Sequence, residues 1–236
     1  MGIHAILIEC DPGNTLGGSC TRDVVNMAAH LDGWADTVNV FTTSDMAAAP
    51  PNTICHRLER AQLKQVVALI PPKSDVLVHI SGHGFQRRDA SHDEMDGFDE
   101  YVRTGNGILL DDDLRELFLV ALRPKGVRFV GLVDTCHSGT MFDLDYTLTQ
   151  SGWKVDTRRE MLPMDAISIG ACTDRQLDQC DVGNVGFGGS LTVHMIDNGL
   201  VKPLFDRAQV KRIHRRLSAI LGKLRQSPVL QSNERF

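Results

Sequence analysis

The chain has 236 residues, with 25 Lys and Arg against 30 Asp and Glu, which gives a formal net charge of −5 at pH 7. A chain of this length can bury roughly 70–75% of its unfolded surface, so its core needs no disulfide or structural metal. The negative balance excludes a general basic surface for nucleic acid. The apolar run near the amino end, ILI, is too short for a signal peptide or a membrane span. We therefore expect a cytoplasmic protein with neither nucleic acid nor membrane as a partner.

Apolar runs and helical patterns alternate along the chain, in the order typical of a mostly parallel sheet with helices on its faces. Strands are expected at residues 4–10, 37–43, 75–80, 127–134, 166–173 and 227–232. Helices are expected at residues 20–35, 56–70, 111–122, 188–196 and 206–226. No linker, repeat or low-complexity segment interrupts this order. The sequence thus predicts one α/β domain over residues 1–236.

The six cysteines are Cys10, Cys20, Cys55, Cys136, Cys172 and Cys180. Without a secretory leader they are better interpreted as reduced thiols than as disulfides. Zinc is disfavoured, because Cys172 and Cys180 are too far apart for a ligand pair and no second pair follows. Most of these cysteines should be small buried apolar residues.

Two of the expected strands end in reactive side chains. VLVHISGHGFQ (76–86) carries His83 after its apolar run, and FVGLVDTCHSG (129–139) carries Cys136 after its own. In an open parallel sheet, ligands bind beyond the carboxyl ends of the strands, and an imidazole beside a thiol can take its proton. We predict Cys136 as nucleophile and His83 as general acid and base, with the Gly84 and Cys136 N–H groups facing an oxyanion. The alternative is a buried His and a core Cys beside tight turns.

Here the sequence resembles a known family. HISGHG (79–84) and DTCHSG (134–139) are similar to the paired His and Cys motifs of the metacaspases, which are cysteine peptidases of the caspase-like fold. GGSCTRDVVNMAAHL (17–31) and SIGACTDRQ (168–176) also have counterparts, whereas LDQCD (177–181) departs from the family's usual continuation.

The resemblance implies a caspase-like three-layer sandwich with a mostly parallel sheet of about six or more strands. It also implies a single peptidase domain, with a large-subunit-like part at about 1–150 and a small-subunit-like part at about 160–236. The arrangement is similar to the compact type I enzymes without a prodomain, and we expect a monomer.

The family prefers Lys or Arg immediately before the cleaved bond, so the expected partners are proteins or peptides with those residues there. By resemblance, the specificity pocket is lined by Cys20, Asp23, Ser81 and Asp134. Carboxylates in a partly desolvated pocket bind a guanidinium or ammonium group and reject an acidic side chain. The alternative for Asp23 is an exposed acid in the first turn of a helix.

Residues 89–113 hold nine acidic residues and one basic residue. Such density is relieved by cations, and carboxylate oxygens are the ligands that Ca²⁺ prefers, although the spacing is not that of an EF-hand. The resemblance implies a calcium site that activates the enzyme, and its expected ligands are Asp99, Asp111, Asp112 and Asp143, with Asp96 as the alternative to Asp99. The competing interpretation is a solvated acidic loop in which Asp111 and Asp112 cap a helix.

Self-cleavage is expected at Lys154, Arg158 or Arg159, in a polar connector, and the alternative is an unprocessed single-chain enzyme. Two other classes of function remain open. A catalytically silent caspase-like protein would act as a scaffold or as a partner in protein quality control. A flavodoxin-like ligand-binding domain would need a phosphate loop, and DPGNTLGGSC (11–20) matches no such pattern well.

Overall fold

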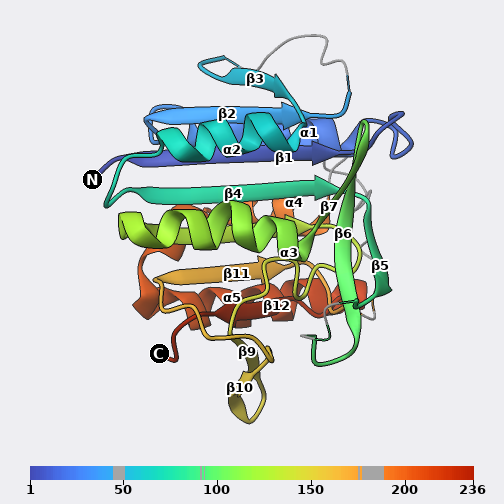
Figure 1. The fold of residues 1–236 in the computed structure, drawn as a ribbon, viewed down its shortest axis with the longest axis vertical. Coiled ribbons are helices and arrows are strands. Elements are labelled where there is room, and N and C mark those ends of the chain that lie inside the picture. The colour runs from blue at the N-terminus through green and yellow to red at the C-terminus, as the bar shows by residue number, and fades with distance from the viewer. Residues whose placement is uncertain (45–50, 91, 93, 175, 177–188) are drawn as a thin grey trace.

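The computed structural model describes residues 1–44, 51–90, 92, 94–174, 176 and 189–236, so Cys180 and the segment 177–181 lie outside the described residues. Within them, nine strands form a central sheet in the order β10-β9-β12-β11-β8-β4-β1-β2-β3 (Figure 1). The strands are β1 Ile3–Cys10, β2 Thr37–Thr42, β3 Ile54–Arg57, β4 Asp75–Gly82, β8 Arg128–Asp134, β9 Tyr146–Thr149, β10 Gly152–Val155, β11 Ala166–Gly170 and β12 Val229–Ser232. Strands β11, β8, β4, β1, β2 and β3 are parallel, whereas β12, β9 and β10 join by antiparallel pairings. The expected mostly parallel α/β sheet is confirmed.

Helices cover both faces of this sheet. One face carries α1 Ser19–Leu31, α4 Ser190–Asp197 and α5 Arg207–Leu221, and the other carries α2 Arg60–Leu69 and a helix that begins as α3 Asp111–Leu114 and continues as the π-helical η1 Arg115–Val120 (Figure 1). Short 3₁₀ turns lie at η2 Arg123–Lys125, η3 Lys202–Phe205 and η4 Gly222–Leu224. No helix in the described part of the chain has both the length and the apolar character needed to cross a membrane.

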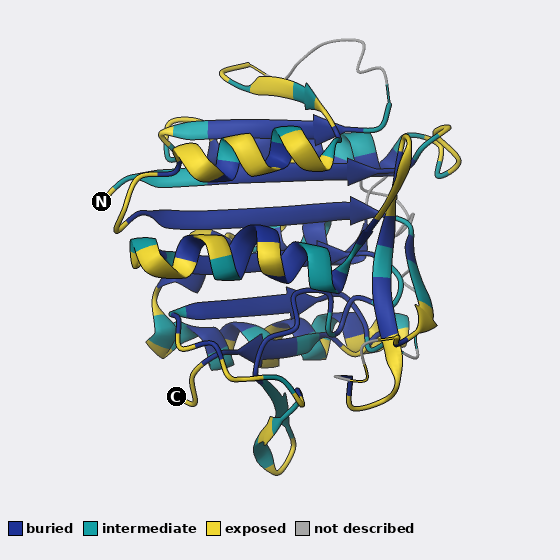
Figure 2. Cartoon of the chain, in the orientation of Figure 1, coloured by how far each residue is buried: buried dark blue, intermediate teal, exposed yellow. Residues whose placement is uncertain are grey.

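The three layers follow from the alternation of side chains along the strands. In β1, Ile6 and Ile8 belong to one buried cluster with α2 and η1, while Ala5 and Leu7 belong to the other, with α1, α4 and α5. Successive residues of a strand point to opposite faces, so a strand that is apolar throughout needs a helix layer on each side. Figure 2 shows this pattern, with buried central strands and helices exposed only on their outer faces.

Helix α5 forms because its apolar side chains gather on one buried face. Val210, Ile213, Leu217 and Leu221 recur at intervals of three and four, and all are buried. Burying each such side chain stabilises the fold by about 1.5–3 kcal/mol. Asp206 caps the helix by accepting a hydrogen bond from the Ala208 N–H at 3.0 Å.

The prediction of a helix at residues 56–70 is wrong for the first turn. Residues 54–57 form β3, which pairs with β2, and the helix begins at Arg60. The ring of His56 stacks on Phe41 with centroids 4.7 Å apart, and its Nε2 lies 3.0 Å from Asn39 Oδ1. These contacts with β2 favour an edge strand over a local helical propensity.

A second sheet, absent from the sequence prediction, stands across the carboxyl ends of the central strands (Figure 1). In the described residues it consists of β5 Gly84–Arg88, β6 Phe98–Thr104 and β7 Gly107–Leu110, in the antiparallel order β5-β6-β7. It begins directly after His83 and ends where α3 begins. The β9–β10 hairpin was also not predicted.

Candidate active site

The two reactive side chains lie at the same end of the central sheet, beyond the carboxyl ends of neighbouring strands. Strands β4 and β8 are parallel neighbours, with Ser81 opposite Asp134. His83 and Cys136 each lie two residues further along, beyond the carboxyl ends of the two strands. The His83 side chain is 33% exposed and Cys136 is partly exposed, so both are accessible to a substrate.

Two glycines allow the His motif to approach its neighbours. A Cβ on Gly84 would lie 1.8 Å from the carbonyl oxygen of Cys136, so the backbones of the two motifs are packed directly against each other. Gly82 has φ of +157°, and a Cβ there would lie 2.4 Å from the carbonyl oxygen of Cys10. A larger residue at either position would push His83 away from its place.

The loop after β1 faces the imidazole. The backbone N–H of His83 donates to the Cys10 carbonyl at 3.1 Å. Its Nε2 lies 2.8 Å from Thr15 Oγ1 and 3.7 Å from Asp11 Oδ1. The sequence analysis gave this segment no catalytic role. The available signal was an Asp at the carboxyl end of a predicted strand, the same kind of position that singled out His83 and Cys136.

The segment after β11 supports the loop that carries the nucleophile. The Ser138 hydroxyl accepts from the Cys172 N–H at 3.1 Å, and the Thr140 N–H donates to Asp174 Oδ1 at 3.1 Å. His137 adopts a left-handed backbone with φ of 51°, and its N–H donates to the Gln176 carbonyl at 3.2 Å. Cys172, Asp174 and Gln176 therefore hold the turn that directly follows Cys136.

The predicted pocket acids lie together at the amino end of α4. Asp23 is buried and accepts hydrogen bonds from Ser81 Oγ at 2.7 Å and from the Gly189 N–H. Asp134, also buried, accepts from the N–H groups of Leu191 at 3.3 Å and Thr192 at 2.6 Å. These hydrogen-bond donors are neutral, and the charge of Arg22 offsets the burial of Asp23 only in part.

Burial, together with the charge of Asp134, raises the pKa of Asp23 to about 7. The alternative of an exposed acid at position 23 is therefore wrong, because only 1% of this residue is exposed. Cys20, one helical turn earlier on α1, is buried as well, and so is Ser81 at the end of β4.

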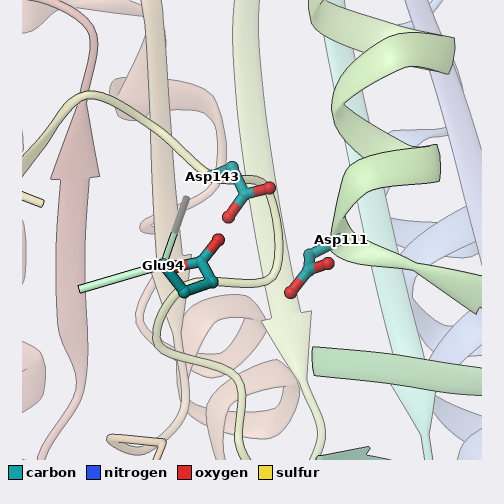
Figure 3. A group of neighbouring side chains, drawn as sticks. All are labelled: Glu94, Asp111 and Asp143. Carbon is teal, nitrogen blue, oxygen red and sulfur yellow. The ribbon is translucent and has the colours of Figure 1, made fainter. Parts of the chain in front are cut away.

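Three carboxylates converge near the nucleophile loop (Figure 3). Glu94, Asp111 and Asp143 are buried, and among the described residues each offers an oxygen within 4.8 Å of the other two. Burial raises the pKa of Glu94 to about 7 and that of Asp111 to about 8, and it also raises the pKa of Asp143. The charges of neighbouring acids add to each of these shifts. We call these three residues the acidic cluster.

The acidic cluster contains two of the four metal ligands expected from sequence. Asp99 instead pairs with Arg87 Nε at 2.9 Å, and Asp112 pairs with the guanidinium of Arg159. Glu94 was counted in the acidic stretch but not singled out. Asp96, the alternative to Asp99, is exposed.

Hydrogen bonds join the acidic cluster to the nucleophile loop. Asp111 Oδ2 accepts from the Glu100 N–H, and the carboxylate of Glu100 accepts from the hydroxyl of Thr140. The Asp143 N–H donates to the Thr140 carbonyl at 2.7 Å. A change in the charge or position of the cluster carboxylates can therefore shift Thr140 through these hydrogen bonds. Thr140 lies four residues after Cys136.

Comparison with known proteins places these features in a family. The family model described as "Metacaspase, peptidase C14 domain" matches residues 4–145, which include both the His and the Cys motif. A crystal structure of a Geobacter sulfurreducens protein superposes with a TM-score of 0.55 at 25% identity, covering 92% of this chain and 89% of that one.

Curated relatives agree with this family. Metacaspase-1B of Aspergillus niger is 34% identical over 148 residues, which are 59% of this chain and 33% of the relative. Metacaspase-1 of Plasmodium falciparum is 32% identical over 130 residues, 52% of this chain and 21% of the relative. The matched region thus spans a third or less of the length of these relatives. Because the family model covers more than half of the chain and both reactive motifs, the chain belongs to the metacaspase family.

Proposed function

We propose that this chain is a cysteine endopeptidase with Cys136 as nucleophile and His83 as general acid and base. The observation that carries the proposal is the register of β4 and β8, which brings both residues to the carboxyl ends of two neighbouring strands. The Cys136 thiolate attacks the scissile carbonyl carbon, and the N–H groups of Gly84 and Cys136 stabilise the resulting oxyanion. The C–N bond then breaks as His83 protonates the leaving amine. Water, deprotonated by His83, hydrolyses the acyl-enzyme and regenerates the thiol.

We infer that the substrate carries Arg or Lys immediately before the cleaved bond. Asp23 and Asp134 support this because they are a buried pair of acids, and every hydrogen-bond donor to them from the described residues is neutral. Burial, and then the charge of Asp134, raise the pKa of Asp23 to about 7, so holding two negative charges there is costly. A cationic side chain would relieve that repulsion, whereas an acidic one would increase it. We further expect the enzyme to act as a monomer in the cytoplasm.

We also propose that Ca²⁺ activates the enzyme at the acidic cluster. The donor set fits, because Glu94, Asp111 and Asp143 are all carboxylates and their pKa values are raised by burial and by the charges of neighbouring acids. Asp143 Oδ2 is buried and accepts no hydrogen bond from the described part of the chain, although Arg159 Nη1 lies 3.3 Å away. When bound, the ion supplies the positive charge that lets the three carboxylates ionise together. Asp99 and Asp112 would join only after leaving their arginine partners.

Of the three sites proposed for self-cleavage, Arg158 fits best. It is exposed and lies outside any helix or strand. Lys154 lies within the hairpin strand β10, and Arg159 is held by Asp112 and Asp143. A peptidase binds its substrate as an extended, accessible segment, which favours Arg158 over the other two.

Cleavage of fluorogenic peptides tests the proposal. Peptides that differ only in Arg, Lys or Asp before the reporter group are incubated with the wild-type chain and with Cys136→Ala, with added Ca²⁺ and with EDTA. We expect Ca²⁺-dependent release from the Arg and Lys peptides by the wild type, and none by Cys136→Ala. Absence of cleavage by a folded wild-type chain in Ca²⁺ would instead support the catalytically silent scaffold.

A further inference from the structure

The first residues after β1 form a polar contact with the catalytic imidazole. Asp11 is almost fully buried, at 1% exposure, and Thr15 lies four residues later. Thr15 Oγ1 is 2.8 Å from His83 Nε2, and it is also 2.7 Å from Asp11 Oδ1. The three side chains therefore form a short relay in the order Asp11, Thr15, His83.

The protons of this relay can be assigned from the chemistry of its members. A carboxylate only accepts hydrogen bonds, so the single hydroxyl proton of Thr15 is donated to Asp11 Oδ1. The hydroxyl oxygen must then accept from the ring, which requires a proton on His83 Nε2. In the neutral imidazole, Nδ1 is left with the free lone pair.

The relay is held in place by its own backbone. Asp11 Oδ1 accepts from the Thr15 N–H at 2.9 Å, and Oδ2 accepts from the Leu16 N–H at 2.9 Å. The Asp11 N–H donates to Glu9 Oε1 at 2.9 Å. With both carboxylate oxygens anchored, Asp11 cannot swing towards solvent, and the Thr15 hydroxyl keeps its direction.

We propose that Asp11 and Thr15 are positioning residues of the peptidase, which fix His83 in the Nε2–H tautomer and leave Nδ1 to take the thiol proton. When His83 becomes an imidazolium, the Asp11 carboxylate, 3.7 Å from Nε2, stabilises its charge. The inference rests on the proposed function, because it requires His83 to be the base. The competing role is structural, with Asp11 and Thr15 only shaping the turn after β1.

Substitutions at Thr15 separate the two roles. Thr15→Val keeps the shape of the side chain but removes the hydroxyl, Thr15→Ser keeps the hydroxyl, and Asp11→Asn removes the charge. Thr149→Val, in β9, is the matched control. We expect Thr15→Val and Asp11→Asn to lower kcat roughly 10- to 100-fold at unchanged KM, since general base catalysis contributes at least that much. Thr15→Ser should stay within about threefold of the wild type.

The tautomer gives a readout that a structural role would not move. In ¹⁵N-labelled protein, with the His83 ring signals assigned by comparison with His83→Gln, we expect Nε2–H in the wild type and in Thr15→Ser. A mixture with Nδ1–H is expected in Thr15→Val. The rate of Cys136 alkylation by iodoacetamide at pH 7 should fall in the same variant.

The alkylation and the NMR measurements need no substrate, so they test the relay even if the proposed Arg or Lys specificity fails. An unchanged tautomer and alkylation rate in folded Thr15→Val would overturn the proposal. So would an equal loss of activity in Thr15→Val and Thr15→Ser, because that would indicate a role in loop shape alone. If Thr15→Val does not fold, the same comparison is made with Asp11→Asn.

Discussion

At the scale of single residues, the site combines one partly exposed reactive pair with one buried acidic pair. His83 and Cys136 are accessible, whereas Asp23 and Asp134 are at most 2% exposed. Chemistry and specificity therefore have different requirements. The reactive pair needs access to a peptide bond, and the acids need a low dielectric in which a charge on the substrate is recognised strongly.

Asp23→Asn tests this division. The amide keeps an acceptor for the Gly189 N–H but removes the negative charge, so kcat/KM for an Arg peptide should fall by the equivalent of about 2–5 kcal/mol. The alkylation rate of Cys136 should remain within about twofold of the wild type, because Asp23 does not touch the thiol. If both rates fell together, the substitution would have damaged the catalytic residues rather than the pocket.

At the scale of elements, the connector between β10 and β11 reaches into the acidic cluster. Arg159 contacts Asp112 and Asp143, so its guanidinium occupies the place of a counter-ion, while its neighbour Arg158 is exposed. A cation that binds the cluster must compete with Arg159. The position of the connector, and with it the exposure of a cleavage site, is therefore linked to the charge of the cluster.

We expect Arg159→Gln to raise the affinity for Ca²⁺ by roughly 3- to 10-fold, measured by calorimetry in the Cys136→Ala background to prevent self-cleavage. Arg158→Gln is the matched control and should leave the affinity unchanged. On gels of the active enzyme, Arg158→Gln should stay intact in Ca²⁺. A lower affinity in Arg159→Gln would show that the arginine supports the site instead of competing for it.

The sequence predicted the elements whose apolar pattern is visible within the element's own residues. Strands β4 and β8 are continuous apolar runs, and a rule of parallel sheets brings their ends together, which is why His83 and Cys136 could be identified. Strands β5, β6 and β7 are short, and β5 and β6 carry charged residues, so their pairing depends on partners that no local pattern reveals.

The same limit applies to the side chains of the site. Glu94 and Thr15 lie in loops, whose paths depend on the packing of distant segments. The arginines that pair with Asp99 and Asp112 come from β5 and from the connector after β10, so their proximity could not be inferred from spacing.

At the scale of the whole molecule, the buried acids couple stability to pH. Glu94 and Asp111 have pKa values of about 7 and about 8 in the fold, against ordinary values of 4.5 and 3.8. Between these limits the native state holds more protons than the unfolded chain, so the free energy of unfolding decreases as pH rises. Below about pH 4 both states are protonated and this contribution is fully present.

In EDTA we therefore expect a lower Tm at pH 8 than at pH 5. Added Ca²⁺ should restore the Tm at pH 8, because a ligand at a hundredfold excess over its Kd stabilises the native state by about 2.7 kcal/mol. For a domain of this size that corresponds to a rise of roughly 5–10 °C. A Tm that is higher at pH 8 in EDTA, or insensitive to Ca²⁺, would contradict the role given to the acidic cluster.

Covalent labelling tests most directly whether this fold is an Arg-directed cysteine peptidase. Two peptide acyloxymethyl ketones, which differ only in Arg or Asp next to the reactive group, are incubated with the wild-type chain in Ca²⁺, and the adducts are located by mass spectrometry. We predict that the Arg probe labels Cys136 alone among the six cysteines and that the Asp probe labels none. Equal labelling by both probes, or an Arg-probe adduct on another cysteine with Cys136 unmodified, would contradict the account.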